Sequence, residues 1–475
     1  MPGANQADRA RPDRPAPDRA AQDGAAQDGA ERRRPGSPLG RMRQLAEATP
    51  AHRDRYVDAL RAFAILVVVL GHWLTSAVTV TDGQLGGVNM IYEVPWAQWA
   101  TWAFQVMPIF FLVGGYANAA SLAKRLDRGD SAAAWAQSRA LRLLRPTAVF
   151  VVVLVIGYAT ALALGADRQL VQTSVWLAGI ALWFLVVYLA VIALAPAVIA
   201  WQRRWGWGVI ATLVAAVAAG DVVRVVTGSD APASANYILG WLAVHQMGVA
   251  WRDGAITRTR RQAWILAVGG AVVAVGLVAW GPYGAPMVGA APSSELGNTA
   301  PPTLALLGLA AMQTGIALLL RPVIEPWLRR PRPWLVVVAV NAVILTIFLW
   351  HMAPVVIAGA TLIATGVFPQ PEVGSGVWFA LRVPWLLILA VLLAALVVVF
   401  ARFEIAAVRR RPGNPSGVVV GLGILTCVAA LVGLGVTGTR GVLPSVGGLP
   451  VGELALFGLG LAAVWRAGRG SRPAV

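Results

Sequence analysis

The stretch VDALRAFAILVVVLGHWLTSAVTV, residues 57–80, decides the class of fold. After Arg61 it runs apolar to Gly71, and the whole is long enough to cross a hydrocarbon core of ~30 Å as a helix. Asp58, Arg61 and His72 interrupt it, and each needs a reason because ionisable side chains inside a membrane span are costly. The stretch therefore predicts a membrane helix that carries functional groups.

Similar apolar stretches recur along the chain. Of its 475 residues, 57% are hydrophobic and 13% are charged, whereas about a quarter of the residues in a soluble domain are charged. We read twelve apolar spans, near residues 57–80, 101–123, 144–164, 174–200, 207–226, 236–251, 263–281, 303–320, 334–360, 381–401, 416–437 and 446–465. The span at 236–251 is the weakest, because it is short and contains His245 and Gln246. The expected fold class is all-α, a polytopic transmembrane bundle of about twelve helices.

The first 52 residues differ from this pattern. Residues 1–52 are rich in Ala, Arg, Asp, Gln, Pro and Gly. Such a composition buries too little apolar surface to offset the entropy of ordering, so it predicts a disordered tail. No apolar run follows the start, so we do not expect a signal peptide. Cys427 is the single cysteine, which excludes an internal disulfide and a cysteine-based metal site; no metal is expected.

Positive charge alternates between successive loops. Clusters of Arg, with Lys124, lie near residues 53–55, 124–142, 203–204, 252–261, 321–332, 402–411 and 466–472. The positive-inside rule places these loops and both termini in the cytoplasm. We therefore expect a multi-pass protein of the plasma membrane with cytoplasmic termini. The charges behind the net +17 cluster in loops between the apolar spans, so we expect no binding to nucleic acid.

His72 lies eleven residues after Arg61, ~16.5 Å along a helix. Eleven steps of ~100° return nearly to the starting angle, so the two side chains share one helix face. A cation near the cytoplasm and an imidazole near the far side then line one track. The alternatives stay open at this point: a buried histidine is often a packed residue, and Asp58 with Arg61 forms a structural ion pair equally well.

These residues match a known family. The pattern Asp58-Ala59-Leu60-Arg61, followed by ten residues and His72, resembles the acyltransferase family 3 proteins, membrane enzymes that transfer acyl groups to hydroxyls of sugars and other acceptors. Three further segments follow in the family's order, FFLVGGY at 110–116, LWFL at 182–185 and LWH at 349–351. The resemblance covers about residues 50–401.

The resemblance implies a division of the chain. A transmembrane acyltransferase domain of ten helices, residues 53–403, would be followed by two additional C-terminal helices within residues 416–466. One departure lies in the segment at 110–116, where the family's serine is Gly114. The role of that hydroxyl is vacant here, and Gly114 and Gly115 also suit close helix packing.

The resemblance also implies roles for residues. His72 would be the catalytic base, supported by Arg61 and Asp58. A cytoplasmic Arg-x-x-Arg site would bind the phosphates of an acyl-coenzyme A donor, acetyl-coenzyme A in particular. Arg139, Arg142 and Arg145, spaced by three, match that site, and arginine suits phosphate because its donors form a rigid fork. An ordinary positive flank of a membrane helix explains the same arginines. We expect no permanently bound cofactor.

A second group of residues reaches the depth of His72. His351 and Asp221 lie 14 to 17 residues into their spans, so the three side chains are expected ~21–26 Å from the cytoplasmic face, where they can converge on one site. Asp221 also has a local partner in Arg224. The expected partners are the bilayer, acyl-coenzyme A and a hydroxylated glycan, glycolipid or small-molecule acceptor. The alternative function is a proton-coupled secondary transporter, which buried histidine and aspartate also fit.

Overall fold

A computed structural model describes residues 53–81, 84–257, 259–289, 295–405, 414–437, 443–446 and 448–467. The predicted tail at 1–52 lies outside these residues. The elements below belong to one unit, Asp54–Val475. The longer helices are α3 (Arg55–Thr75), α6 (Met107–Leu126), α7 (Ala132–Ala163), α9 (Leu182–Trp205), α10 (Trp207–Thr227), α11 (Asn236–Arg252), α12 (Arg260–Trp280), α13 (Leu304–Trp327), α17 (Gly376–Ile405), α18 (Gly417–Thr437) and α19 (Val451–Arg466). The shorter elements are β1 (Ser76–Thr81), β2 (Gln84–Asn89), α4 (Met90–Glu93), α5 (Ala97–Phe104), α8 (Arg168–Ala178), α14 (Pro331–Ala342), α15 (Ile344–Trp350) and α16 (Ala353–Ala358).

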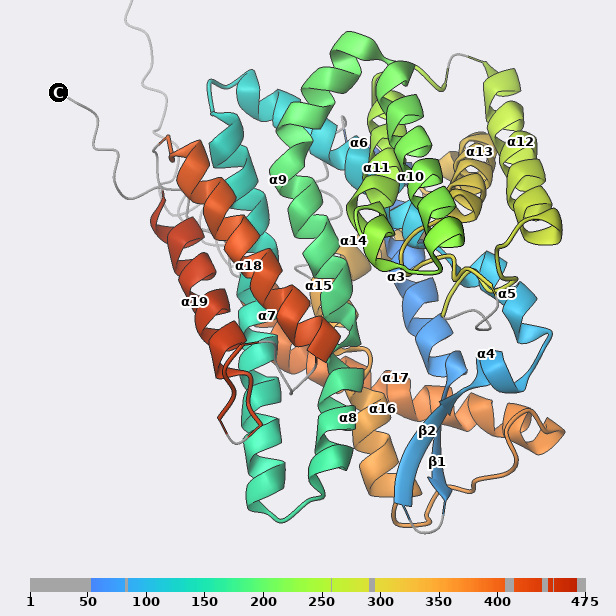
Figure 1. Cartoon of the computed structure of the whole chain (residues 1–475), viewed down its shortest axis with the longest axis vertical. Coiled ribbons are helices and arrows are strands. Elements are labelled where there is room, and N and C mark those ends of the chain that lie inside the picture. The colour runs from blue at the N-terminus through green and yellow to red at the C-terminus, as the bar shows by residue number, and fades with distance from the viewer. Residues whose placement is uncertain are drawn as a thin grey trace, which may run out of the picture. The chain divides into compact units, whose positions relative to one another are not determined.

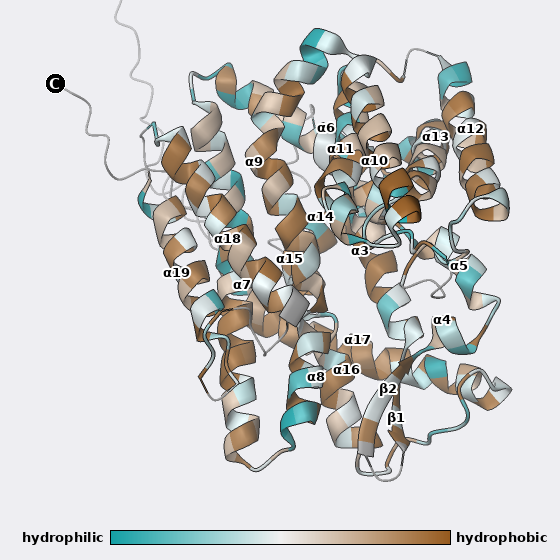
Figure 2. Cartoon of the chain, in the orientation of Figure 1, coloured by the Kyte–Doolittle hydropathy of each residue, from teal (hydrophilic) through white to brown (hydrophobic). Residues whose placement is uncertain are grey.

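The helical membrane bundle expected from the sequence is confirmed. Among the described residues, ten helical segments are long and apolar enough to cross a membrane. Two further predicted spans are the shorter helices α11 and α19, of 17 and 16 residues. Figure 1 shows the helices packed side by side, and Figure 2 shows apolar residues along most of them. Many of these apolar side chains are exposed, as on α12 and α17, which is what a hydrocarbon surround requires.

α3 links the two ends of the bundle. Its 21 residues span about 31 Å at ~1.5 Å per residue, close to the thickness of the hydrocarbon core. Asp54 caps its first turn by accepting hydrogen bonds from the backbone N–H groups of Tyr56 and Val57. Near this end α6 contacts both α3 and α7: Tyr116 of α6 donates to the capping Asp54, and Arg139 of α7 donates to Ser121 of α6. We call it the arginine-rich end, after Arg61, Arg125, Arg139 and Arg142.

The first predicted span is too long at its far end. The helix stops at Thr75, and residues 76–81 form strand β1, which pairs with β2 in an antiparallel hairpin (Figure 1). Residues 77–81 read AVTVT, and four consecutive β-branched side chains favour a strand over a helix. The apolar run therefore contains parts of two elements, a membrane helix and the first strand of the β1–β2 hairpin, which lies at the end opposite the arginines.

The predicted span at 334–360 is a broken helix rather than a continuous one. α14, α15 and α16 follow one another with breaks at Val343 and at His351–Met352, and a π-helical turn follows at Gly359–Ile363. Pro354 lies in the first turn of α16; it has no N–H for the carbonyl four residues earlier and its ring crowds that turn. Broken helices within a membrane bundle are tolerated where the freed backbone groups are buried in protein or line a cavity.

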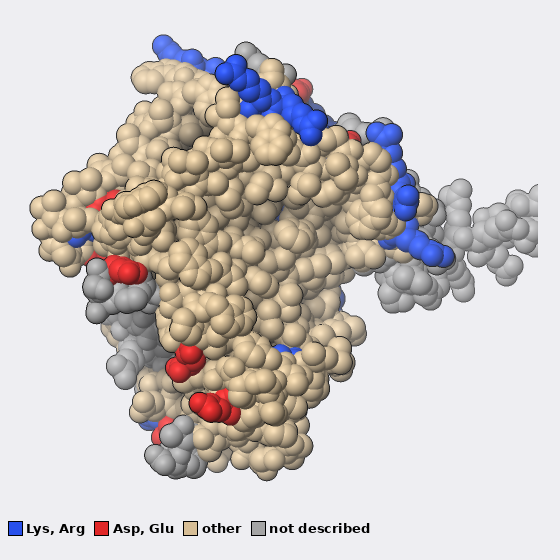
Figure 3. Space-filling model, turned by 90° about the vertical axis from the view of Figure 1, so that its right-hand side faces the viewer, with Lys and Arg blue, Asp and Glu red and all other residues tan. Residues whose placement is uncertain are grey.

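Charge is distributed unevenly between the two ends. Figure 3 shows Lys and Arg gathered along one end of the visible face, and most of the visible Asp and Glu away from that end. Such an asymmetry is typical of a membrane protein with a positive cytoplasmic side.

Candidate active site

His72 lies in the last turn of α3 and lines a large cavity. The cavity has a volume of about 2700 Å³ and includes Gly71, His72 and Thr75 in its wall. The imidazole of His72 makes no hydrogen bond to any described residue. An imidazole that faces a cavity without a protein partner keeps a ring nitrogen available for a substrate.

His351 lies beside His72 although 279 positions separate them in the sequence. The centroids of the two rings are 5.1 Å apart. His351 occupies the break between α15 and α16, and its backbone carbonyl accepts a hydrogen bond of 2.6 Å from the indole Nε1 of Trp73. The neighbour of His72 on α3 therefore holds the broken helix against α3 and brings the two imidazoles together.

The hydrogen bonds of His351 fix which ring nitrogen carries its proton. Its Nδ1 lies 2.6 Å from the backbone carbonyl oxygen of Phe348. Because a carbonyl only accepts, Nδ1 must donate, and in the neutral ring Nε2 is then the free acceptor. Nε2 of His351 is buried and has no partner among the described residues. The pair thus offers a proton acceptor on His72 and a preset acceptor on His351, both in the wall of one cavity.

The cavity lies toward the hairpin end of the bundle. Its wall includes residues of the β1–β2 hairpin, the loop before α8 and the segment at 295–300. The cationic side chains of Arg61, Arg139 and Arg142 are absent from it. The histidine pair consequently marks the floor of a space reached from the end opposite the arginines.

Asp58 and Arg61 form the ion pair that their spacing allows. The Nη1 of Arg61 lies 3.5 Å from a carboxylate oxygen of Asp58. Along the face of α3 that joins Arg61 to the cavity, Ala64 and Ile65 are buried and Val68 is the first residue of the cavity wall. The track expected from the sequence is present as one helix face, and packed side chains fill its middle.

The arginine-rich end holds several cations near one another. The Nη2 of Arg139 donates to the hydroxyl of Ser121, at 2.6 Å, and to the carbonyl of Ala117, at 3.3 Å, both on α6. The charges of Arg61, Arg125 and Arg142 all act on Arg139. No carboxylate among the described residues pairs with Arg139. Mutual repulsion in such a cluster is relieved by an anion with several oxygens, such as a phosphate.

Arg142 differs from Arg139 in its surroundings, whereas Arg145 is half-buried like Arg139. The side chain of Arg142 is exposed, and its charge acts on Glu404 of α17. Glu404 accepts hydrogen bonds from the backbone N–H groups of Leu345 and Thr346, so it caps the start of α15 from a distant helix. Nothing in the sequence pattern singles out Glu404, because it follows a long apolar span.

Two other buried polar groups lie apart from the histidine pair. Asp221 accepts hydrogen bonds from the hydroxyl of Tyr283, at 3.0 Å, and from the backbone N–H of Leu304, at 2.7 Å. Its carboxylate also lies 4.0 Å from Arg224. The structure therefore does not bring Asp221 to His72 and His351, and the similar depth expected from the sequence did not make the three converge.

His245 is fully buried and its ring is held from both sides. Its Nε2 lies 3.2 Å from the side-chain amide of Asn118, and its Nδ1 lies 3.1 Å from that of Gln246. These bonds fit a structural role for His245 between α6 and α11. Within the described part of the chain, no group of three His, Cys, Asp or Glu residues could hold a metal ion.

The glycines of the segment at 110–116 act in packing. A Cβ on Gly115 would overlap the backbone carbonyl of His245, and a Cβ on Gly248 would overlap that of Leu112. α6 and α11 therefore cross at backbone contact. A Cβ on Gly114 would meet the ring of Tyr188 at 3.2 Å, which fills the place where a serine side chain would project.

The three other family-like segments converge on the histidine pair. The ring centroid of Phe184 lies 5.0 Å from that of Phe110 and 5.0 Å from that of Phe348, and the ring of Phe348 stacks on His351 at 5.9 Å. An aromatic chain thus connects the segments at 110–116, 182–185 and 349–351, and it packs behind the imidazoles.

The sequence model of the acyltransferase domain family, acyltransferase family 3, matches residues 54–403. The chain belongs to this family. The resemblance of the first helix is thereby confirmed, and the protein is a multi-pass membrane acyltransferase of family 3. A comparison with curated proteins and one with solved structures gave no match. In this family 3 acyltransferase the match includes both histidines and ends before α18 and α19.

Proposed function

We propose that the chain moves an acetyl group from cytoplasmic acetyl-coenzyme A to a hydroxyl of an acceptor that enters from the other side of the membrane. The observation that carries the proposal is the position of His72 and His351. The pair forms the floor of a cavity of about 2700 Å³ whose wall lies toward the hairpin end, away from the arginines. Donor and acceptor therefore approach the imidazoles from opposite ends.

The donor end of the site is the arginine cluster. Arg139 is braced by α6 and has no carboxylate partner among the described residues, and Arg142 is exposed beside it. These side chains bind the phosphates of coenzyme A, and Arg61 supports the cluster from α3. The pantetheine arm, a linear chain, passes along the face of α3 toward His72 and displaces the packing around Ile65.

Transfer at the histidines requires one proton acceptor. A ring nitrogen of His72 takes the proton of the acceptor hydroxyl while the hydroxyl oxygen attacks the thioester carbonyl carbon. The C–S bond then breaks, the coenzyme A sulfur leaves, and the imidazolium returns the proton to it. The free Nε2 of His351 accepts a hydrogen bond from a second hydroxyl of the acceptor, because the one proton of the attacking hydroxyl goes to His72, and this bond orients the acceptor.

The proposal includes the orientation of the protein in the plasma membrane. Both termini and the arginine-rich end face the cytoplasm, in line with the positive-inside rule. The acceptor is a sugar, glycan, lipid or small molecule with a free hydroxyl, and the modification is an O-acetylation.

The test uses the purified full chain in lipid nanodiscs with acetyl-labelled coenzyme A thioester. We expect thioester cleavage that needs His72, with the label appearing on a hydroxylated acceptor or, more slowly, in acetate. A carrier would behave differently: in proteoliposomes it would move a substrate along a proton gradient and leave the thioester intact. Flux without thioester cleavage would refute acyl transfer.

A further inference from the structure

An arginine lies in the wall of the cavity, and the proposed transfer does not use it. Arg382 of α17 lines the cavity together with both histidines. Its Nη1 donates to the backbone carbonyl of Ser76, at 3.2 Å, and its Nε is buried without a partner. No carboxylate among the described residues pairs with it. Arg224 lines the same cavity but is paired with Asp230 at 2.8 Å.

A structural role as the cap of α3 explains only one of the contacts that the guanidinium of Arg382 can make. Ser76 is the residue at the end of α3, and a cation there stabilises the carbonyl end of a helix. That contact uses one of the five N–H donors of a guanidinium. Arg382 as a whole is half-buried, but its Nε donor is buried and unpaired, which is costly, so helix capping alone leaves the burial of this atom unexplained.

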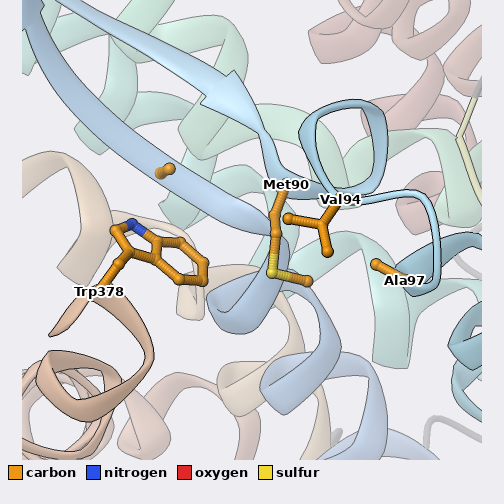
Figure 4. Close-up of a cluster of buried hydrophobic side chains, with 5 residues drawn as sticks. Met90, Val94, Ala97 and Trp378 are labelled. Carbon is orange, nitrogen blue, oxygen red and sulfur yellow. The ribbon is translucent and has the colours of Figure 1, made fainter. Parts of the chain in front are cut away.

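The guanidinium of Arg382 is held in place from behind. Its central carbon lies 3.9 Å from the ring centroid of Trp378. Trp378 belongs to a buried cluster with Ala77, Met90, Val94 and Ala97, and Figure 4 shows its indole beside Met90. A stacked and anchored guanidinium loses little freedom when it binds an anion, so Arg382 is preorganised as an anion site.

This anion site is close to the reacting groups. Ser76 follows His72 by four residues, so the carbonyl bound by Arg382 lies about 6 Å further along the chain at ~1.5 Å per residue. An acidic group held by Arg382 therefore places its carrier's neighbouring hydroxyls within reach of the histidine pair.

An apolar side pocket adjoins the same cavity. It has a volume of about 230 Å³ and shares Leu154, Trp176, Trp183 and Gly435 with the wall of the main cavity. Its remaining lining comes from α7, α8 and the C-terminal segment, including Leu434, Leu449 and Leu454. Part of the pocket lining, from α18 and α19, thus lies beyond residue 403 and outside the acyltransferase domain.

The main cavity also reaches the outer surface of the helices near this pocket. Trp176 of α8 and Val432 of α18 both line it, and they are 48% and 42% exposed. Since α18 and the helical segment that contains α8 are long and apolar enough to cross a membrane, we place these exposed side chains against the bilayer. An apolar chain can enter from the bilayer without passing through water.

We propose that the acceptor is an acidic amphiphile: a hydroxylated head group that carries a carboxylate or phosphate bound by Arg382, with an apolar chain in the side pocket formed by α7, α8, α18 and α19. The proposal rests on the acyl transfer proposed above and names its acceptor class. It also gives the two C-terminal helices a role, which is to hold the apolar part of the acceptor.

A photoreactive dodecyl phosphate with a diazirine at the end of its chain tests this placement directly. The full chain in nanodiscs is irradiated with the probe, and labelled peptides are mapped by mass spectrometry. We expect labelling of α18 or α8 that excess dodecyl phosphate prevents and that neutral dodecyl glucoside and chain-free methyl phosphate do not.

Two variants separate the contributions of charge and chain. Arg382→Gln should reduce the labelling about tenfold, as expected for loss of a charged hydrogen bond, and Arg382→Lys should restore part of it. Gly435→Phe fills the side pocket, and no atom lies within 4 Å of its Cβ position, so it should abolish labelling there. The controls are Arg402→Gln, at the other end of α17, and Gly421→Phe, which has equal room on α18; both should label as the wild type does.

Undiminished labelling in Arg382→Gln, or labelling spread over the lipid-facing helices without competition, would overturn the inference. Failure of the acyl transfer itself has a different signature, since labelling does not depend on it. If acetyl-coenzyme A is cleaved, then acetylation of dodecyl glucuronide should exceed that of dodecyl glucoside, and Arg382→Gln should remove the difference. An equal loss with both acceptors would assign Arg382 to the thioester instead and refute the acceptor site.

Discussion

Replacement of Arg142 by alanine tests the donor end of the site. The side chain lies about three turns into α7, is exposed and makes no hydrogen bond to a described residue, so its loss should leave the fold intact. A hydrogen bond to a charged group contributes ~1.5–3 kcal/mol, and solvent exposure favours the lower value. About 1.4 kcal/mol corresponds to a tenfold change in affinity. The dissociation constant of acetyl-coenzyme A should therefore rise about tenfold in the variant.

Ionic strength provides a second axis for the same measurement. The Debye length is ~10 Å at 0.1 M salt and ~3 Å at 1 M, so an exposed contact is largely screened at high salt. The dissociation constant is measured by titrating the protein in nanodiscs with labelled acetyl-coenzyme A. Arg142→Ala should raise this constant strongly at low salt and only slightly at ~1 M salt. Arg128→Ala, an exposed arginine at the end of α6, is the control. Equal affinities for wild type and Arg142→Ala at low salt, or equal losses in both variants, would show that the cluster only sets topology.

Three further predictions concern the fold. Gly115→Ala should lower the free energy of unfolding by ~1–3 kcal/mol, because the new Cβ overlaps backbone across the α6–α11 crossing. Gly269→Ala has open space around its Cβ and should not lower it. Equal melting temperatures for the two variants would contradict the crossing. Glu404→Gln should also destabilise by ~1–3 kcal/mol because the carboxylate caps α15, and an unchanged unfolding midpoint would argue against this cap. Reporter fusions after Lys124 and within 285–300 should report opposite sides of the membrane, and reporters on the same side would refute the topology.

The sequence was informative where one helix carries the pattern. The Arg61-x10-His72 spacing predicted the helix, its charged start and the histidine at its far end, because all of these follow from helical geometry. Hydropathy alone missed the β1–β2 hairpin, since Val78 and Val80 are as apolar in a strand as in a helix. The break at His351 had a signal in Pro354, which the apolar pattern concealed.

The site itself is assembled from segments that no local pattern connects. His72 and His351 were expected at one depth, but depth does not fix the angle of a side chain around the bundle, and Asp221 at similar depth lies elsewhere. No signal in the sequence indicated that Arg382 and Glu404 make specific contacts, because each lies in or next to an apolar span and their partners come from distant parts of the chain. Tertiary packing decides which buried polar groups meet.

Acyl transfer by this chain depends most directly on His72 as the proton acceptor, and the deciding measurement is the turnover of His72→Gln. Glutamine keeps hydrogen-bonding capacity but cannot take the hydroxyl proton, so acetyl transfer by the full chain in nanodiscs should fall by ~10²–10⁴-fold, as for loss of a general base. Affinity for acetyl-coenzyme A and the melting temperature should stay near those of the wild type, and His351→Ala should lose less activity than His72→Gln. Near-native turnover in His72→Gln would contradict the account and shift the proton transfer to His351.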